Sequence, residues 1–180
     1  MNPEQPNFNP EKEILWEQKL AEVGGITDRL GKGVDEKIKE PVVAFLVHEF
    51  TTNGSCEGHV AEEGKDKHGL PFPWINVCTT EPEGWRESEE KKKEWAIANI
   101  KEQQRMMNFL SEFYQGREAP FDARLTFRGI GAFGGFRVQS FGAEMMTLLS
   151  PEEQKKKLEL YRKEMDDFTK FLKDKHFSKE

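Results

Sequence analysis

Most of the side chains that could bind a metal through sulfur or nitrogen lie in one segment. The chain has two cysteines and four histidines, and five of these six residues lie between His48 and Cys78. Within this segment, Cys56 and His59 are separated by two residues, one of which is Gly58. A tight turn at this spacing can aim a thiolate and an imidazole at one point, and glycine adopts the positive φ that such a turn needs. The spacing is typical of half of a tetrahedral zinc site.

The other half of such a site would come from the remaining cysteine and histidines of the segment. The predicted ligand set is Cys56, His59, His48 and Cys78. His68 lies in a charged stretch and is expected to face solvent. Because metal binding contributes to folding, an ion held here would also fix a region that is rich in loop residues. The first hypothesis is therefore a metal- or small-ligand-binding module with zinc as its cofactor.

The central pair of residues also suits thiol chemistry. A thiolate is the reactive form of cysteine, and a neighbouring imidazole lowers the pKa of the thiol. In this second hypothesis Cys56 is the nucleophile of a small enzyme that acts on a nucleotide or RNA. His59 is then its base, and Glu57 orients or polarises the reacting groups. A third interpretation involves no chemistry: Cys56 is a small buried apolar residue, and His59 satisfies a loop carbonyl.

Polar and aromatic residues around this pair would complete a binding pocket. Backbone N–H groups in the turn at Gly58 could bind an oxyanion or a phosphate. Ser55 adds a hydroxyl group, and Trp74 with Phe72 would form an apolar wall on the following strand. We therefore expect Ser55, Gly58 and Trp74 to contact a small ligand.

The same residues carry a resemblance to other proteins. The matching positions are Thr52, Ser55, Cys56, Gly58, His59, Pro73, Trp74 and Ile75. They form the pattern T-x-x-S-C-x-G-H followed by P-W-I, which resembles small uncharacterised proteins of environmental bacteria and phages, whose function is unknown. A more distant likeness is to the wybutosine-synthesising tRNA methyltransferases, which carry T-x-S-S-C-S-G-R. In this comparison His59 replaces the arginine, and the resemblance would imply an enzyme acting on RNA.

A glycine-rich stretch later in the chain matches the pattern G-x-G-x-x-G from Gly129 to Gly134. In a dinucleotide-binding fold this pattern opens a helix, whereas the residues from Phe136 onward alternate as in a strand. We therefore expect a β-hairpin over residues 121–142, with apolar residues on its core face and arginines facing solvent.

The remaining elements are expected to place these residues in one α+β domain. Apolar spacing, caps and breakers predict helices over 10–23, 27–50, 88–115 and from 151 onward, together with a strand over 74–78. The second helix would be kinked at Pro41, although residues 42–47 would also suit a buried strand. Residues 51–59 are expected to form a loop. The predicted order is α-α-β-α-β-β-α, with a small antiparallel or mixed sheet packed by long helices, in a single domain over 10–180 that follows a flexible arm over 1–9.

The composition excludes several classes of protein. Of the 180 residues, 36% are hydrophobic and 33% are charged, which suits one soluble domain. The longest apolar run is too short to cross a membrane, and the N-terminal residues do not resemble a signal peptide. Two cysteines cannot form a disulfide framework, so we expect a cytoplasmic protein. The net charge of −6 argues against non-specific binding to nucleic acid.

A further hypothesis concerns interactions between proteins. The helices expected over 88–115 and 151–175 carry apolar stripes at helical spacing. Such a stripe can pack against a helix of another molecule as well as against its own core. The chain could therefore be an interaction protein that forms a homo-oligomer through these helices.

Overall fold

The computed structural model describes residues 9–28, 30–60 and 69–178, and these residues form an α+β fold as expected. Its elements in chain order are α1 (Pro10–Gly25), the 3-10 helix η1 (Glu36–Ile38), α2 (Lys39–Val47), β1 (Thr52–Cys56), β2 (Trp74–Val77), α3 (Glu89–Phe113), β3 (Leu125–Ile130), β4 (Gly135–Ser140), the 3-10 helix η2 (Phe141–Leu148) and α4 (Pro151–Phe177). Within the described ranges, none of the helices has both the length and the apolar character needed to span a membrane. The arm predicted over 1–9 lies outside these ranges except for Asn9, and so does His68.

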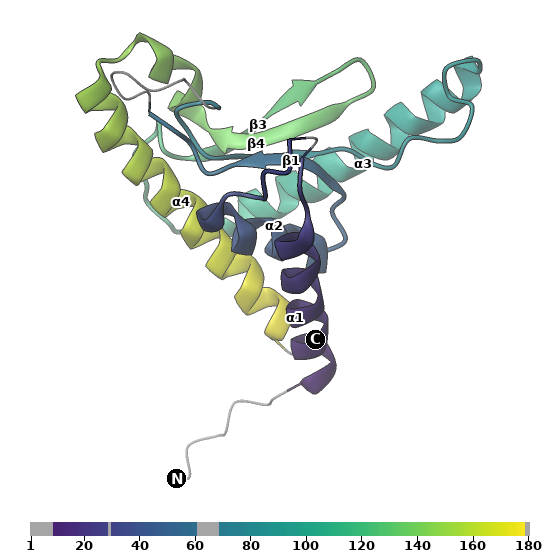
Figure 1. Cartoon of the computed structure of the whole chain (residues 1–180), viewed down its shortest axis with the longest axis horizontal. Helices are drawn as coiled ribbons and strands as arrows, with labels where there is room; N and C mark the ends of the chain where they lie inside the picture. Colours follow the sequence, from purple (N-terminus) through teal and green to yellow (C-terminus); the bar gives the residue numbers. More distant parts are fainter. Residues whose placement is uncertain (1–8, 29, 61–68, 179–180) are drawn as a thin grey trace.

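The four strands form one antiparallel sheet in the order β1-β2-β4-β3. Ile75 and Val77 of β2 pair with Val138 and Phe136 of β4, and all four side chains are fully buried. Because side chains alternate between the two faces of a strand, these residues form one apolar face. Figure 1 shows α1, α2 and the C-terminal part of α4 together on one side of the sheet. The main core lies between this apolar face and the helices.

The helix α4 follows directly from its sequence. Ser150 and Glu153 form a reciprocal capping box, and Pro151 occupies the first helical position, where its missing N–H costs nothing. Its apolar stripe is buried along the whole helix, at Leu158, Tyr161, Met165, Phe168 and Leu172. The stripe packs inside its own chain, so it is not free to pair with a second copy.

The segment between α1 and β1 is less helical than predicted. The helix expected over 27–50 is limited to η1 and α2, and Thr27 pairs with Gly33 in an isolated bridge. Pro41 is the third residue of α2, where a proline removes no hydrogen bond of the helix. The helix therefore begins near Pro41 and is not kinked by it, and residues 42–47 are helical.

The prediction of a loop over 51–59 is wrong in part, because residues 52–56 form the strand β1. This strand reads TNGSC and lacks the apolar alternation that marks most strands. It is instead defined by its pairing with β2, in which Cys56 lies opposite Trp74. A Cβ on Gly54 would be 3.4 Å from the indole of Trp74, so glycine lets the ring lie against the strand. The observed order is α-α-β-β-α-β-β-α.

The hairpin predicted around the glycine-rich stretch is confirmed by the pairing of β3 with β4. Gly131 and Gly134 have positive φ values of 66° and 77° in the connecting turn. The chain then continues as a strand, so the glycines serve a hairpin and do not open a helix. At the turn, Phe133 stacks on Trp95 with ring centroids 5.1 Å apart.

Candidate metal centre

The structure brings together two of the predicted ligands, Cys56 and His59, and adds Asp35. One ligand atom from each residue, a sulfur, a ring nitrogen and a carboxylate oxygen, lies within 4.8 Å of the other two. The closest described contact joins His59 Nε2 and Asp35 Oδ2 at 3.0 Å. Three side chains that bind transition metals therefore converge on one point.

The bend after β1 positions the thiol and the imidazole. Cys56 is the last residue of the strand, and the chain turns at Gly58, which has a φ of 85°. The backbone N–H of Gly58 donates to Cys56 Sγ at 3.4 Å, and the N–H of His59 donates to the carbonyl oxygen of Leu70 at 2.8 Å. A Cβ at position 58 would lie 2.6 Å from Leu158 Cδ1 and 2.7 Å from the carbonyl carbon of Phe72. Only glycine fits this bend, both in conformation and in space.

Asp35 was not predicted from the sequence. It lies 24 residues before His59, directly before η1, and its Oδ2 also accepts from the backbone N–H of Glu57 at 3.3 Å. The chain has 33 acidic residues, and no regular spacing links this one to Cys56. Its low exposure distinguishes it from most of them, because only 15% of its side chain is accessible. That property belongs to the fold and is not visible in the sequence.

Glu57, predicted to orient or polarise reacting groups, contacts residues of η1 and α4 through its side chain. Its Oε2 accepts from the backbone N–H of Lys37 at 2.9 Å, and its Oε1 lies 3.4 Å from Nη2 of Arg162. Arg162 of α4 also donates to the carbonyl oxygens of Glu57 at 3.0 Å and Gly58 at 2.8 Å. Glu57 and Arg162 therefore tie the bend to η1 and α4, and neither belongs to the converging group.

Burial and hydrogen bonds shift the pKa values of two of the three residues. Burial raises the pKa of Asp35, but the hydrogen bonds from His59 and from the Glu57 backbone outweigh it, so the pKa is lower than usual. Burial raises the pKa of the Cys56 thiol; the hydrogen bond from the Gly58 N–H opposes this in part, and the negative charge of Asp35 adds to the increase. The carboxylate is thus ready to bind a cation, whereas the thiol keeps its proton unless a cation displaces it.

A pocket of about 510 Å³ opens beside the three residues, between β1 and the segment that precedes η1. Two of the residues predicted to contact a ligand, Ser55 and Trp74, line this pocket, whereas Gly58 does not. Lys32 contributes a cationic side chain on the opposite wall. The converging group is therefore accessible to a small molecule from one side.

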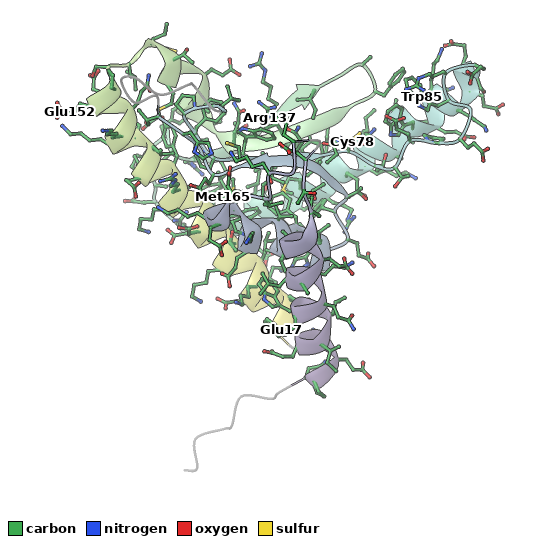
Figure 2. The ribbon with its side chains drawn as sticks, in the orientation of Figure 1. Glu17, Cys78, Trp85, Arg137, Glu152 and Met165 are labelled. Carbon is green, nitrogen blue, oxygen red and sulfur yellow. The ribbon has the colours of Figure 1, made fainter. Side chains whose placement is uncertain are left out.

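The other two predicted ligands, His48 and Cys78, do not join the group. His48 ends α2, and its Nε2 lies 2.8 Å from the carbonyl oxygen of Leu172 in α4. Cys78 follows β2 at the end opposite the Cys56–Trp74 pair, on the side of the sheet near α3 (Figure 2). These residues are close in the sequence because they lie on consecutive elements, but their side chains lie in different parts of the fold. Within the described residues, the converging group found consists of Asp35, Cys56 and His59.

Comparison of the chain with protein-family models, with curated proteins and with solved structures found no match. The geometry of the site is therefore the basis for inferring a function.

Proposed function

We propose that this protein binds a zinc ion through Asp35, Cys56 and His59, and that a small ligand reaches the ion from the adjoining pocket. The observation that carries the proposal is the convergence of the three ligand atoms within 4.8 Å of one another. In a tetrahedral zinc site, two ligands bound at about 2.0–2.3 Å from the ion lie about 3.5 Å apart. His59 Nε2 and Asp35 Oδ2, at 3.0 Å, are already near this spacing, and a pair close to the 4.8 Å limit would draw together when an ion binds.

The chemistry of the donor atoms favours zinc over the common oxygen-binding cations. Calcium and magnesium take oxygen ligands, and a thiolate is a poor partner for both. One sulfur, one nitrogen and one oxygen form a mixed set that zinc accepts in tetrahedral geometry. A thiolate ligand also has to stay reduced, which supports the cytoplasmic location that we infer from the cysteine content.

Three protein ligands leave one position of a tetrahedral zinc ion for a water molecule or a ligand. Sites of this kind bind or transform small molecules, whereas purely structural zinc sites use four protein ligands. The pocket beside Asp35, Cys56 and His59 gives a ligand access to that position. A bound zinc ion would supply a Lewis acid and would lower the pKa of its water. Ser55 and Trp74 would contact the remainder of the ligand.

The hypothesis of a thiol-dependent enzyme has less support. Cys56 is 5% exposed, and burial together with Asp35 raises the pKa of its thiol. In a Cys–His pair the imidazole accepts the thiol proton, whereas here the ring of His59 bonds to Asp35. A metal ion removes the difficulty, because it displaces the thiol proton when it binds.

The exposed apolar surface available for a helix-mediated interaction is smaller than the sequence predicts. The apolar stripe of α4 is buried in the chain's own core. On α3, Ile100 and Met107 of the predicted stripe are 58% and 53% exposed, and Ile97, outside that stripe, is 45% exposed. Three scattered apolar side chains are common on protein surfaces and do not require a partner.

The resemblance to small bacterial and phage proteins is carried by residues around this site, including Cys56, Gly58 and His59. We propose that a bend built on glycine, with a thiol on one side and an imidazole on the other, is the feature that those proteins share with this chain. The replacement of the methyltransferase arginine by His59 favours metal binding over that more distant likeness.

Metal analysis of untagged protein tests the proposal. We expect about one zinc ion per chain. The variants Cys56→Ser and His59→Gln should each weaken zinc binding by more than about 100-fold, because loss of a ligand exceeds the effect of losing a supporting residue. The measurement is zinc content together with competition against a chelator of known affinity.

Two matched controls make the same substitutions at a cysteine and a histidine outside the site. Cys78→Ser and His48→Gln should keep the zinc content of the wild type, because neither residue belongs to the converging group. A folded wild-type protein that takes up no zinc would contradict the proposal. Equal losses in the site variants and in the controls would contradict it as well.

A further inference from the structure

A guanidinium for which the described residues supply no carboxylate partner stacks on Trp74, a residue of the pocket beside the proposed metal site. Arg137 of β4 stacks on Trp74, with its Cζ 4.1 Å from the ring centroid, and its Nε donates to Asn76 Oδ1 at 2.9 Å. Within the described residues, neither of its Nη atoms has a protein partner. Half-buried arginines are usually paired, so these free donors indicate a place for an acceptor that the protein itself does not supply.

The sheet places Arg137 on the same face as Cys56. Cys56 pairs with Trp74, and Asn76 pairs with Arg137. Since paired residues and residues two apart in a strand share a face, all four side chains lie on one side of the sheet. Figure 2 shows Arg137 on the side of the sheet opposite Met165 of α4. This is the face that leads to the proposed metal ligands, away from the core.

The surroundings of Arg137 are unfavourable for a cation on its own. Arg128 lies directly opposite on β3, and like charges at paired positions repel. Trp74, on which Arg137 stacks, is paired with Cys56 and lines the pocket, so the guanidinium is one residue away from the proposed ligands across the sheet. An anion bound between the metal and Arg137 would offset this repulsion and use the free donors.

A second cation reaches the pocket from the opposite wall. Lys32 lines the pocket, and its Nζ lies 3.6 Å from Oδ1 of Asp35 with 59% of the side chain exposed. Such a loose ion pair contributes little to stability, so the ammonium group can turn towards a ligand without much cost. Lys32 on the pocket wall and Arg137 on the outer face of Trp74 thus place two cations around the site within a chain of net charge −6.

We propose that the ligand of this site is a small molecule that carries an oxyanion, either a phosphate or a carboxylate. One oxygen occupies the open position of the metal, and others bind the guanidinium of Arg137. The inference rests on the proposed zinc site. The planar fork of arginine matches both groups, and the pocket of about 510 Å³ has room for the rest of a small organic molecule.

Cobalt(II) in place of zinc gives the site a visible spectrum that responds to a ligand at the open position. Phosphate and, separately, acetate should shift the spectrum of the cobalt-loaded protein in a saturable way. The anion that binds more tightly identifies the group that the natural ligand carries. Arg137→Gln should weaken binding of that anion by about tenfold or more, because two charge-assisted hydrogen bonds are lost. Without an anion, its cobalt spectrum should equal that of the wild type.

Two further variants complete the experiment. Arg128→Gln is the matched control, because its arginine faces Arg137 but pairs with the exposed Glu144. It should change anion binding by less than about threefold. Arg137→Lys keeps the charge and most of the side-chain stem, so it serves if the glutamine variant fails to fold. It should bind the anion at least about threefold more weakly than the wild type, because a lysine cannot form the fork.

The outcomes separate this inference from the one on which it rests. If the protein takes up no cobalt, the proposed metal site is contradicted. If cobalt binds but neither anion shifts the spectrum, the metal site stands and the oxyanion ligand is overturned. Unchanged anion binding in folded variants of Arg137 would overturn it too.

Discussion

Two regions of this fold contain histidines beside other titratable groups, and they differ in what contacts the rings. At the end of β1, His59 Nε2 lies 3.0 Å from a carboxylate oxygen of Asp35, next to a thiol and an open pocket. Where α1, α2 and α4 meet, the rings of His48 and His176 have centroids 6.1 Å apart. Each of these two Nε2 atoms contacts a main-chain carbonyl oxygen, at 2.8 Å and 3.1 Å.

The comparison shows that proximity of histidines does not make a metal site. A ring N–H that donates to a backbone carbonyl holds two elements together, and that nitrogen is then engaged with the main chain and not with another side chain. The ring of His48 also packs against Phe109 with centroids 5.0 Å apart. A site for a ligand needs donor atoms whose partners are other side chains, together with space beside them. The region around His59 has both, whereas in the described part of the chain His48 Nε2 contacts the main chain.

The strongest test of this contrast changes the bend that the metal region requires. Gly58→Ala would place a Cβ 2.6 Å from Leu158 Cδ1 and 2.7 Å from the backbone of Phe72, at a φ of 85°. We expect the free energy of unfolding to fall by at least about 3 kcal/mol, because strain and overlap act together. Equilibrium unfolding in urea measures the change.

A second glycine separates the cost of backbone strain from the cost of steric overlap. Gly116 has a φ of 71°, and a Cβ there would meet no other atom within 4 Å. Gly116→Ala should therefore cost only about 1 kcal/mol, the cost of the backbone conformation alone. Similar losses in the two variants would show that the bend at Gly58 is not uniquely tight.

The next test compares the arginine that supports each region. Arg162 donates to the carbonyl oxygens of Glu57 and Gly58, and 16% of its side chain is exposed. Arg162→Gln should lower the free energy of unfolding by about 1–3 kcal/mol, and it should weaken zinc binding about tenfold because the bend is held less firmly. Unfolding in urea and chelator competition give the two values.

The matched change in the other region is Arg105→Gln. Arg105 donates to the carbonyl oxygen of His48 at 2.7 Å and lies over the ring of Phe50. Its removal should reduce stability by about 1 kcal/mol and leave zinc affinity unchanged, since its described contacts are to His48, Glu102 and Phe50 and not to the proposed ligands. A loss of zinc affinity of equal size in both variants would mean that stability alone controls metal binding.

The sequence determines the helices of this fold well because their signals are local. The helices predicted from residue 10 and from residue 151 both begin there, at the cap of Asn9 and at the capping box of Ser150 and Glu153. The apolar stripe of α4 needs no knowledge of its partners, because any helix with that spacing has one apolar face. The boundaries of α2 were harder, since Pro41 can interrupt a helix or lie in its first turn.

The candidate site is harder to predict because pairing and distant contacts create it. The strand β1 exists because β2 lies beside it, and its polar residues carry no alternation of their own. Asp35 joins the group only after the segment before η1 folds back over β1, and many acidic residues would have been equally plausible. Conversely, His48 and Cys78 are near Cys56 in sequence, but the fold directs them elsewhere. Spacing identified the two residues of the converging group that share one turn, and it could not identify Asp35.

The smallest expected effect concerns protonation in the region of His48. Burial lowers the pKa of His48, and the positive charges of His176, Lys175 and Arg105 lower it further, against the carbonyl of Leu172. The folded state therefore binds this proton less readily than the unfolded chain, whose histidine titrates near pH 6.5. As the pH falls below about 6.5, the imidazole contributes a loss of stability that grows until the folded state is protonated as well.

The variant His48→Gln isolates this contribution, because glutamine does not titrate. Above about pH 7 this histidine is neutral in both the folded and the unfolded state. The curves of unfolding free energy against pH for the wild type and for the variant should therefore run parallel there. Below about pH 6.5 the wild type should lose stability more steeply than the variant, and the difference between the two curves is the quantity to measure. Parallel curves down to pH 5 would mean that the ring of His48 is not held in its neutral form, and the contrast with His59 would then rest on ligand geometry alone.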